Sequence, residues 1–242
     1  VSIIVRTTGL RPGFLEEALQ SLANQNICCF QAIVVQDGAE SMRATAAAFE
    51  PLFESLEFIS IPQSGRSAAG NAGLKAARGE LVGFLDDDDL LLASHVEMLA
   101  TKLGNQPERP AVTAFAIEVP TEVICPIMPV YREFELRNRV REPFSSSLIL
   151  SKNQFPIQAH LFRRELYLQH GGMDESLDAL EDWDLWIRYS RSGPFATVPK
   201  STSLYRVPAN PEEDRSRKEW LGNAFHAIFA KHPEVESAPR SP

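Results

Sequence analysis

The alternation of apolar runs with helical patterns in the first half of this 242-residue chain is the feature that most constrains its fold. Apolar runs rich in β-branched residues predict strands, and apolar residues at helical spacing between them predict helices. Strands are predicted at 1–5, 32–35, 56–61 and 81–85, and helices from Pro12 onward and at 41–52, 67–77 and 93–103. This order favours a sheet covered by helices on both faces. We therefore predict an α/β/α sandwich with a mostly parallel central sheet.

The second half follows a less regular pattern. A strand is predicted at 112–119 and helices at 162–169, 182–191 and 217–231, whereas 120–158 carries prolines and few clear periods. A chain of this length is sufficient for one large domain with a small appendage. We predict a main domain at 1–207 and a C-terminal helical tail at 208–242, where the sequence becomes polar.

The charge balance limits the classes of partner. The chain has 24 lysines and arginines against 32 aspartates and glutamates, a formal net charge of −8, and no basic cluster. Nucleic-acid binding requires a basic footprint, so we expect no nucleic-acid partner. A phosphorylated small molecule is not excluded, because a divalent metal ion can supply positive charge.

The cysteine content and the hydropathy of the chain indicate its cellular location. Three cysteines are too few for a disulfide framework, which favours a reducing compartment. No apolar run reaches the roughly 20 residues that span a bilayer. We therefore expect a cytoplasmic protein without a membrane span in this chain, which could still lie peripherally at a membrane. The strand-like run at Val1, with no initiator methionine, suggests a domain excised from a longer protein.

Four consecutive aspartates, Asp86 to Asp89, directly follow the predicted strand at 81–85. Their mutual repulsion disfavours a purely structural role, and a hard divalent cation that prefers oxygen ligands would relieve it. In an extended segment Asp86 and Asp88 point to one side, so one pair can face a site. The alternative is a solvated acidic turn that caps the next helix. The four residues alone favour neither interpretation.

Two more acidic residues lie where a site would form. Asp37 ends a predicted strand, and ligands of such sheets gather at the carboxyl ends of the strands. Alternatively, Asp37 and Gly38 form only a turn. Asp182 begins a predicted helix, where a carboxylate suits the helix dipole. In a functional role, Asp182 would open into a pocket as a general base, partly shielded by Trp183 or Trp186.

The segment from Ser64 to Gly79 is rich in small residues but matches neither common phosphate-binding glycine motif. We expect Gly70, Ala72 and Gly73 to allow close packing of a helix. Arg66 and Arg78 could still reach a diphosphate.

Taken in order, these segments resemble the family 2 glycosyltransferases of the GT-A fold. The likeness covers roughly residues 1 to 206, and the ordered set is more specific than any single piece. The matching segments are 1–5, 22–25, 34–38, 71–74, 76–80, 84–89, 171–175 and 181–188.

The resemblance implies a GT-A-type nucleotide-binding sandwich and an inverting glycosyltransferase of the hexosyltransferase type. The donor would be a nucleotide-diphosphate sugar, most commonly a UDP-sugar, and the acceptor a saccharide or lipid-linked hydroxyl in polysaccharide biosynthesis. Carried over by position, Asp182 would take the acceptor proton, and Asp88 of the Asp-x-Asp motif would ligate Mn²⁺ or Mg²⁺. The implied nucleotide-binding residues are Thr7, Asp37, Arg66, Asp86 and Asp87.

The chain departs from the family pattern at three places. Gln36-Asp37-Gly38-Ala39 stands where Asp-Asp-Gly-Ser is frequent, and Gly70 replaces an Arg that commonly precedes Asn-Ala-Gly. Tyr205-Arg206 continues to Val207-Pro208 rather than to a nearby His.

Two other functions remain open at this point. A nucleotidyltransferase would share the layout and the acidic metal site but release pyrophosphate instead of a nucleoside diphosphate. A non-catalytic module would bind a nucleotide sugar without turnover.

Overall fold

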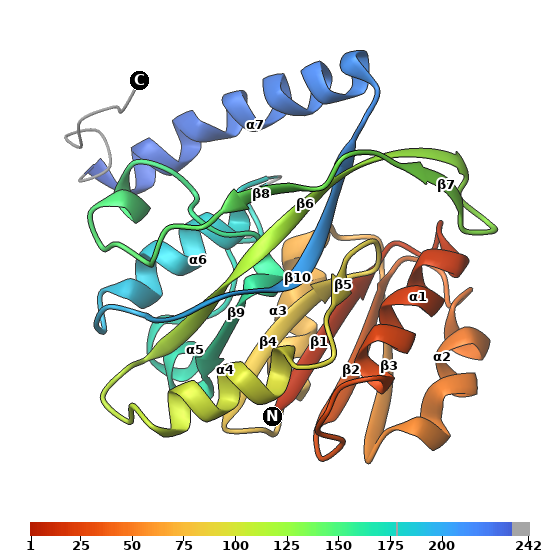
Figure 1. Ribbon diagram of the computed structural model, residues 1–242, viewed down its shortest axis with the longest axis horizontal. Coiled ribbons are helices and arrows are strands. Elements are labelled where there is room, and N and C mark those ends of the chain that lie inside the picture. The colour runs from red at the N-terminus through yellow and green to blue at the C-terminus, as the bar shows by residue number, and fades with distance from the viewer. Residues whose placement is uncertain (178, 234–242) are drawn as a thin grey trace.

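The first four strands form the parallel half of the sheet. The structure, a computed structural model, describes residues 1–177 and 179–233, and its described strands make one ten-stranded sheet. Strands β1 (Ser2–Thr7), β2 (Gln31–Asp37), β3 (Ser55–Ile61) and β4 (Leu81–Asp86) pair in the order β3-β2-β1-β4, all parallel (Figure 1). Their carboxyl ends therefore meet at one edge, which brings Asp37 and the aspartate run to the same side of the sheet.

Helices cover both faces of this half, as the sequence predicted. One face carries α1 (Pro12–Ala23), α2 (Arg43–Phe49) and α4 (His95–Gly104), and the other carries α3 (Arg66–Ala76), α5 (Arg164–His170) and α6 (Glu181–Ser190). Alternate residues of β1 enter different cores: Ile3 packs with Leu15 and Leu19, whereas Ile4 packs with Leu74. Burial on both faces explains why this strand is apolar without alternation.

The second half makes the sheet mixed. Strand β9 (His160–Arg163) is antiparallel to β4 and to β6 (Ala111–Cys125), and β6 runs parallel to β10 (Ala196–Pro208). The short strands β5 (Leu90–Leu91), β7 (Val130–Glu133) and β8 (Arg137–Val140) are antiparallel additions. The α/β sandwich is thus confirmed, but parallel pairing dominates only its first half. The helix predicted at 162–169 starts at Arg164, because His160–Arg163 is taken up by strand pairing.

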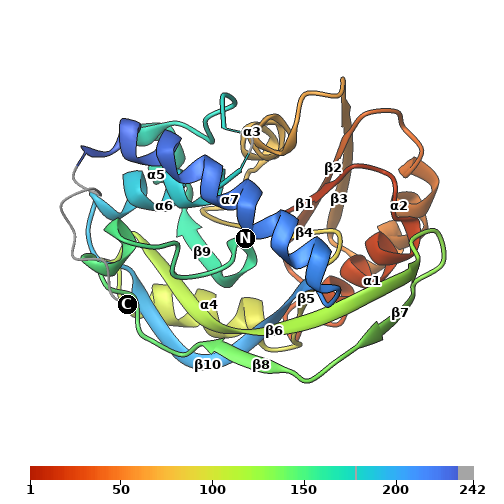
Figure 2. The ribbon, with the colours of Figure 1, turned by 90° about the horizontal axis from the view of Figure 1, so that it is seen from above.

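The C-terminal helix α7 (Pro211–Lys231) crosses the top of the molecule over the strand ends (Figure 2). The Asn210 side chain accepts hydrogen bonds from the Glu212 and Glu213 amides and caps its start. At its far end Ile228 is buried and Lys231 pairs with Asp174 and Asp184. The second half of α7 therefore packs against the main domain, with Leu221, Phe225 and Phe229 partly buried there, whereas most of 211–220 is exposed. Residues 234–242 lie outside the described residues.

Two glycines of α3 allow close packing, as expected from the sequence. A Cβ atom on Gly73 would lie 2.3 Å from Cγ2 of Ile4, and one on Gly70 would lie 2.5 Å from Sδ of Met173. The arginine common at position 70 in the family would have to displace Met173. This departure is therefore explained by packing.

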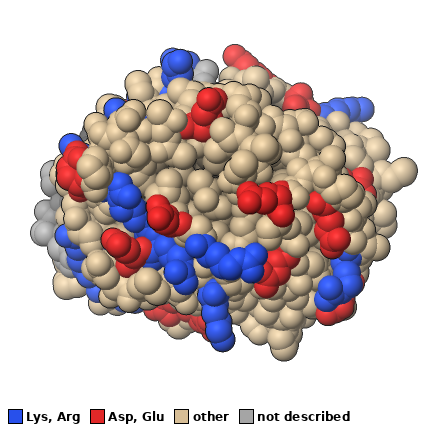
Figure 3. Space-filling view, turned by 90° about the horizontal axis from the view of Figure 1, so that it is seen from below, with Lys and Arg blue, Asp and Glu red and all other residues tan. Residues whose placement is uncertain are grey.

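Two further properties concern the hydropathy of the helices and the charges on the surface. No helix in the described part of the chain is long and apolar enough to cross a membrane. On the face opposite α7, a short row of Lys and Arg side chains is flanked by Asp and Glu side chains (Figure 3).

Candidate active site

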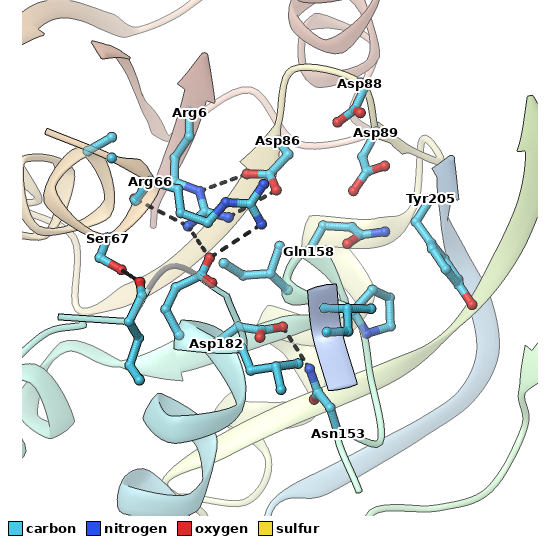
Figure 4. A pocket seen from close by; sticks show the side chains of 18 of the residues that line it. Arg6, Arg66, Ser67, Asp86, Asp88, Asp89, Asn153, Gln158, Asp182 and Tyr205 are labelled. Atoms are coloured by element: carbon cyan, nitrogen blue, oxygen red, sulfur yellow. Dashed lines mark hydrogen bonds and ion pairs between the residues drawn. The ribbon is translucent and has the colours of Figure 1, made fainter. Parts of the chain in front are cut away.

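A cavity of about 870 Å³ lies at the carboxyl ends of the parallel strands. This volume is within the usual range for small-molecule sites. Its lining comes from β1, β2, β4, the segment 152–158, the start of α6, the end of β10 and one side of α7. All the site residues predicted from the sequence line it: Thr7, Asp37, Arg66, Asp86, Asp87, Asp88 and Asp182. The structure therefore gathers the predicted residues in one place (Figure 4).

The four aspartates, Asp86 to Asp89, form what we call the acidic wall. Asp86 receives two hydrogen bonds from Arg6, from Nε to Oδ1 at 2.7 Å and from Nη2 to Oδ2 at 2.9 Å. Burial would raise the pKa of Asp86, but the charge and hydrogen bonds of Arg6 outweigh it and lower that pKa. Arg6 also bonds Glu181 at 3.0 Å and is 5% exposed, so it links the acidic wall to the start of α6.

Arg11 bridges the next two aspartates. Its Nη2 lies 2.5 Å from Oδ1 of Asp87, and its Nη1 lies 2.6 Å from Oδ2 of Asp88. The Thr7 hydroxyl donates to Asp87 at 2.6 Å. Burial raises the pKa of Asp87 to about 7 despite Arg11. The side chains of Thr7 and Asp87 are thus mainly bonded within the protein.

Asp89 and Arg206 close the acidic wall at the end of β10. The Arg206 amide donates to Asp89 Oδ1 at 3.1 Å, and the Arg206 guanidinium donates to the Asp88 carbonyl at 2.8 Å. Burial holds the pKa of Asp89 well above its ordinary value. The sequence predicted a divalent cation as the relief for repulsion among the four aspartates. The structure also places three arginines, Arg6, Arg11 and Arg206, against the four aspartates, and the sequence analysis had assigned a role to none of them.

A divalent ion would find two partly exposed carboxylates in the acidic wall. Asp88 has 29% and Asp86 24% of its side chain exposed, whereas Asp87 and Asp89 are buried. Among residues 1–177 and 179–233, no three His, Cys, Asp or Glu side chains are grouped to enclose a metal. Mg²⁺ in phosphate sites commonly takes one or two carboxylates and completes its shell with substrate phosphates and water. Asp88 beside Asp86 fits such a shared site, rather than a metal site made by protein ligands alone.

Asp37 organises the loop before α3. Its two carboxylate oxygens accept the backbone N–H groups of Ser64 at 2.7 Å and Gly65 at 3.0 Å. Gly65 has φ of 91°, a conformation that favours glycine. The neighbouring Gln36 accepts the Met42 amide and donates to Ser41, so this departure from the family pattern stabilises the turn after β2.

Arg66, the first residue of α3, lies at the open side of the cavity. Its side chain is 50% exposed and 3.8 Å from Glu181, and its guanidinium lies 5.6 Å from the ring of Trp220 in α7. The position of α7 over the cavity was not anticipated from the sequence.

Asp182 lies opposite the acidic wall, beside the amide of Asn153 (Figure 4). A second amide of the cavity lining, that of Gln158, donates to the Leu204 carbonyl at 3.3 Å; we call these two amides the amide wall. Asn153 donates to Asp182 at 2.9 Å. Burial, and then the nearby Glu181 charge, raise the pKa of Asp182 to about 6. The preceding Leu180 has φ of 61°, the left-handed region that non-glycine residues seldom adopt.

The predicted shielding by tryptophan rings is not what the structure shows. Trp183 and Trp186 are fully buried in the core, and Trp183 donates to the Ile149 carbonyl. Neither ring lines the cavity: Trp183 follows Asp182 on a neighbouring face of α6, and Trp186 lies one turn further along the helix, inside the core.

Comparison with known proteins identifies the family. The family model described as glycosyl transferase family 2 matches residues 2–141, more than half of the chain. This chain belongs to glycosyl transferase family 2. Curated relatives agree: the protein is 26% identical over 215 residues to the uncharacterized glycosyltransferase YwdF of Bacillus subtilis, covering 85% of this chain and 73% of YwdF. It is 27% identical over 220 residues to the amylovoran biosynthesis glycosyltransferase AmsE of Erwinia amylovora, covering 87% and 76%.

Solved structures show the same fold for this family 2 glycosyltransferase. Residues 1–349 of S. aureus TarS in complex with UDP-GlcNAc superpose with a TM-score of 0.71 at 17% identity, covering 99% of this chain and 67% of that one. The Pyrobaculum calidifontis mannosyltransferase PcManGT, in complex with GDP-Man and Mn²⁺, gives 0.71 at 21% identity, covering 98% and 65%. The predicted GT-A fold is thereby confirmed. Family membership also decides for a glycosyltransferase over a nucleotidyltransferase.

Proposed function

We propose that this family 2 glycosyltransferase moves a sugar from a nucleotide-diphosphate donor to an acceptor hydroxyl with inversion. One observation carries the proposal: a single cavity holds both the acidic wall and Asp182, a carboxylate whose pKa is raised to about 6. The complexes of TarS with UDP-GlcNAc and of PcManGT with GDP-Man and Mn²⁺ support a nucleotide-sugar donor. We take a UDP-sugar as the first donor to test.

In this mechanism Asp182 is the general base. The acceptor hydroxyl attacks the anomeric carbon from the face opposite the diphosphate, the carbon–oxygen bond to the diphosphate breaks, and Asp182 accepts the hydroxyl proton. A carboxylate with a pKa of about 6 is mostly ionised at neutral pH and is a stronger base than a solvated aspartate. A divalent ion held by Asp88, Mn²⁺ or Mg²⁺, would stabilise the charge on the departing diphosphate.

The remaining predicted residues would hold the nucleotide. Arg66 has an exposed guanidinium at the cavity edge and is suited to the diphosphate. Asp37 would accept a hydrogen bond from the base with a lone pair not used by Ser64 and Gly65. Asp86 and Asp87, held by Arg6 and Arg11, would shape the ribose and diphosphate side of the cavity together with Thr7, which bonds Asp87.

The proposed acceptor is a saccharide or a lipid-linked saccharide, and the proposed setting is cytoplasmic polysaccharide biosynthesis, free or peripheral at a membrane. The name of AmsE, an amylovoran biosynthesis glycosyltransferase, supports the pathway class.

Calorimetric titration with UDP, GDP and dTDP, with and without Mn²⁺, tests the donor site. We expect one nucleotide to bind in a metal-dependent manner, and Asp88→Ala to abolish the metal dependence while the fold is retained. No nucleotide binding to the wild-type chain under either condition would refute the proposal. Nucleotide binding without release of nucleoside diphosphate from any donor would indicate a non-catalytic binding module instead.

A further inference from the structure

One guanidinium, that of Arg11, neutralises both the buried Asp87 and the accessible Asp88. We propose that Arg11 occupies the place of the divalent cation in the donor-free protein and is drawn to the diphosphate when the donor arrives. Metal and nucleotide then bind cooperatively, and Arg11 is the source of much of that cooperativity. This inference rests on the proposed function, because it assumes that Asp88 shares a metal with a diphosphate.

The contact distances imply that Arg11 and a divalent ion compete for Asp88. Arg11 Nη1 lies 2.6 Å from Oδ2 of Asp88, within the reach of a strong charge-assisted hydrogen bond. A divalent ion bound at the same carboxylate would lie within a few ångströms of the guanidinium, and the two cations would repel strongly in a cavity partly screened from water. The metal therefore binds well only when Arg11 leaves Asp88.

The structure gives Arg11 room to leave. Its side chain is 32% exposed, and it lies at the start of α1 after a turn that contains Gly9 with φ of 75°. Arg6 makes the contrast: it is 5% exposed and held between Asp86 and Glu181. Arg6 is thus fixed in the acidic wall, whereas Arg11 can exchange its hydrogen-bond partners.

A diphosphate provides the new partner. Arg11 lines the same cavity as Arg66, so a donor placed there offers phosphate oxygens to its guanidinium. Phosphate oxygens are good acceptors for arginine, and their negative charge also attracts the metal. Donor binding consequently removes the competitor and adds metal ligands in one step.

The test measures the coupling between Mn²⁺ and UDP, with GDP as the second nucleotide, in the absence of turnover. Free Mn²⁺ is followed by electron paramagnetic resonance, and nucleotide affinity by calorimetry with and without Mn²⁺. In Arg11→Gln we expect the affinity for Mn²⁺ alone to rise about tenfold, the affinity for nucleotide alone to fall, and the coupling factor to shrink. The factor must be the same whichever ligand is added first, which provides an internal check.

Two further variants are controls for Arg11→Gln. Arg11→Lys retains a cation beside Asp88, so its affinity for Mn²⁺ alone should stay as low as that of the wild-type chain. Arg43→Gln removes an exposed arginine that pairs with Glu40 and lies over the Phe58 ring, away from the cavity, and should leave all the binding constants unchanged. Thermal unfolding of each variant verifies that it is folded.

Failure of the role of Arg11 and failure of the proposed function give different results. If Mn²⁺ and nucleotide bind cooperatively but Arg11→Gln matches Arg43→Gln in every constant, the role of Arg11 is refuted and the proposed function stands. If the wild-type chain takes up no Mn²⁺ even with bound nucleotide, the metal component of the proposed function fails, and the inference fails with it.

Discussion

The two sides of the cavity satisfy their polar groups to different degrees. Within the acidic wall, Asp86, Asp87 and Asp88 each bond an arginine side chain, and Asp89 bonds the Arg206 amide. In the amide wall, Oδ1 of Asn153 and Oε1 of Gln158 are buried without a hydrogen-bond partner among the described residues. The carboxylates of one side are paired, and Nε of Arg206 is the unpaired buried atom beside them, whereas the other side carries few charges and two unpaired amide oxygens among the described residues.

The difference shows which side is complete before any ligand binds. The buried pair of Arg6 with Asp86 fixes one end of the acidic wall, because breaking a charged hydrogen bond in a buried setting is costly. An unpaired buried amide oxygen also costs free energy, and native proteins keep few of them. The amide wall is therefore the side of the cavity whose hydrogen bonding is incomplete, and it lies next to Asp182.

The largest expected effect is at Asp182. Asp182→Asn keeps the shape and the bond to Asn153 but removes the base, so we expect transfer to fall about 10²–10⁴-fold while nucleotide affinity is nearly unchanged. Release of nucleoside diphosphate and calorimetry measure the two properties. Wild-type turnover in this variant would show that the base is elsewhere.

The same variant has a stability signature. Because burial raises the folded-state pKa of Asp182 from 3.8 to about 6, its contribution to stability is present below pH 3.8 and is lost as the pH rises to about 6. Asp182→Asn lacks this loss, so its stability relative to the wild-type chain should increase between pH 4 and 7, by on the order of 2 kcal/mol. Denaturant unfolding at several pH values measures it, and a constant difference would contradict the raised pKa.

A smaller effect is expected from the amide that touches the base. Asn153→Leu removes the hydrogen bond that lowers the pKa of Asp182 without opening the site to water, so that pKa should rise further. The acidic limb of the pH–activity profile should then move to higher pH, with less activity near pH 6. Gln158→Met, which has no contact with Asp182, is the matched control, and an identical shift in both variants would refute the role of Asn153.

The smallest effect compares two neighbouring glutamines in the cavity lining. Oε1 of Gln154 accepts the Ser145 amide at 3.2 Å, whereas Oε1 of Gln158 has no partner among the residues described and its Nε2 makes one long bond, 3.3 Å, to the Leu204 carbonyl. Gln154→Met should lower the free energy of unfolding by about 1 kcal/mol, and Gln158→Met should lower it by less, because its loss of that bond is offset by removal of the unpaired Oε1. Equal losses in chemical denaturation would mean that Oε1 of Gln158 is also bonded in solution.

Much of the site could be predicted from the sequence because the ends of the strands can be located in it. The apolar runs that end at Asp37 and Asp86 fix where β2 and β4 stop, and parallel strands bring those ends to one edge. Asp182 followed from the helix predicted at 182–191, and the structure places it in the first turn of α6, which begins one residue earlier at Glu181. The roles of these residues were implied by resemblance to the family and are still predictions.

The side chains that bond these residues could not be predicted from the sequence in the same way. Arg6 left a weak signal, a charged residue directly after the apolar run of β1. Arg11, Asn153 and Gln158 left none, because each becomes part of the site through a contact with a residue distant in sequence. The irregular stretch at 120–160 has no periodicity from which such contacts could be inferred.

The sequence by itself determined the α/β order, the strand ends that carry the acidic residues and the family, since each depends on local periodicity or on motifs in a fixed order. Only the tertiary structure decided how the aspartate charges are balanced, that α7 covers the cavity, that Asn153 bonds Asp182 and that Gln158 lines the same cavity. Charge pairing and burial depend on distances in space between remote segments, and those distances exist only once the sheet has brought the segments together.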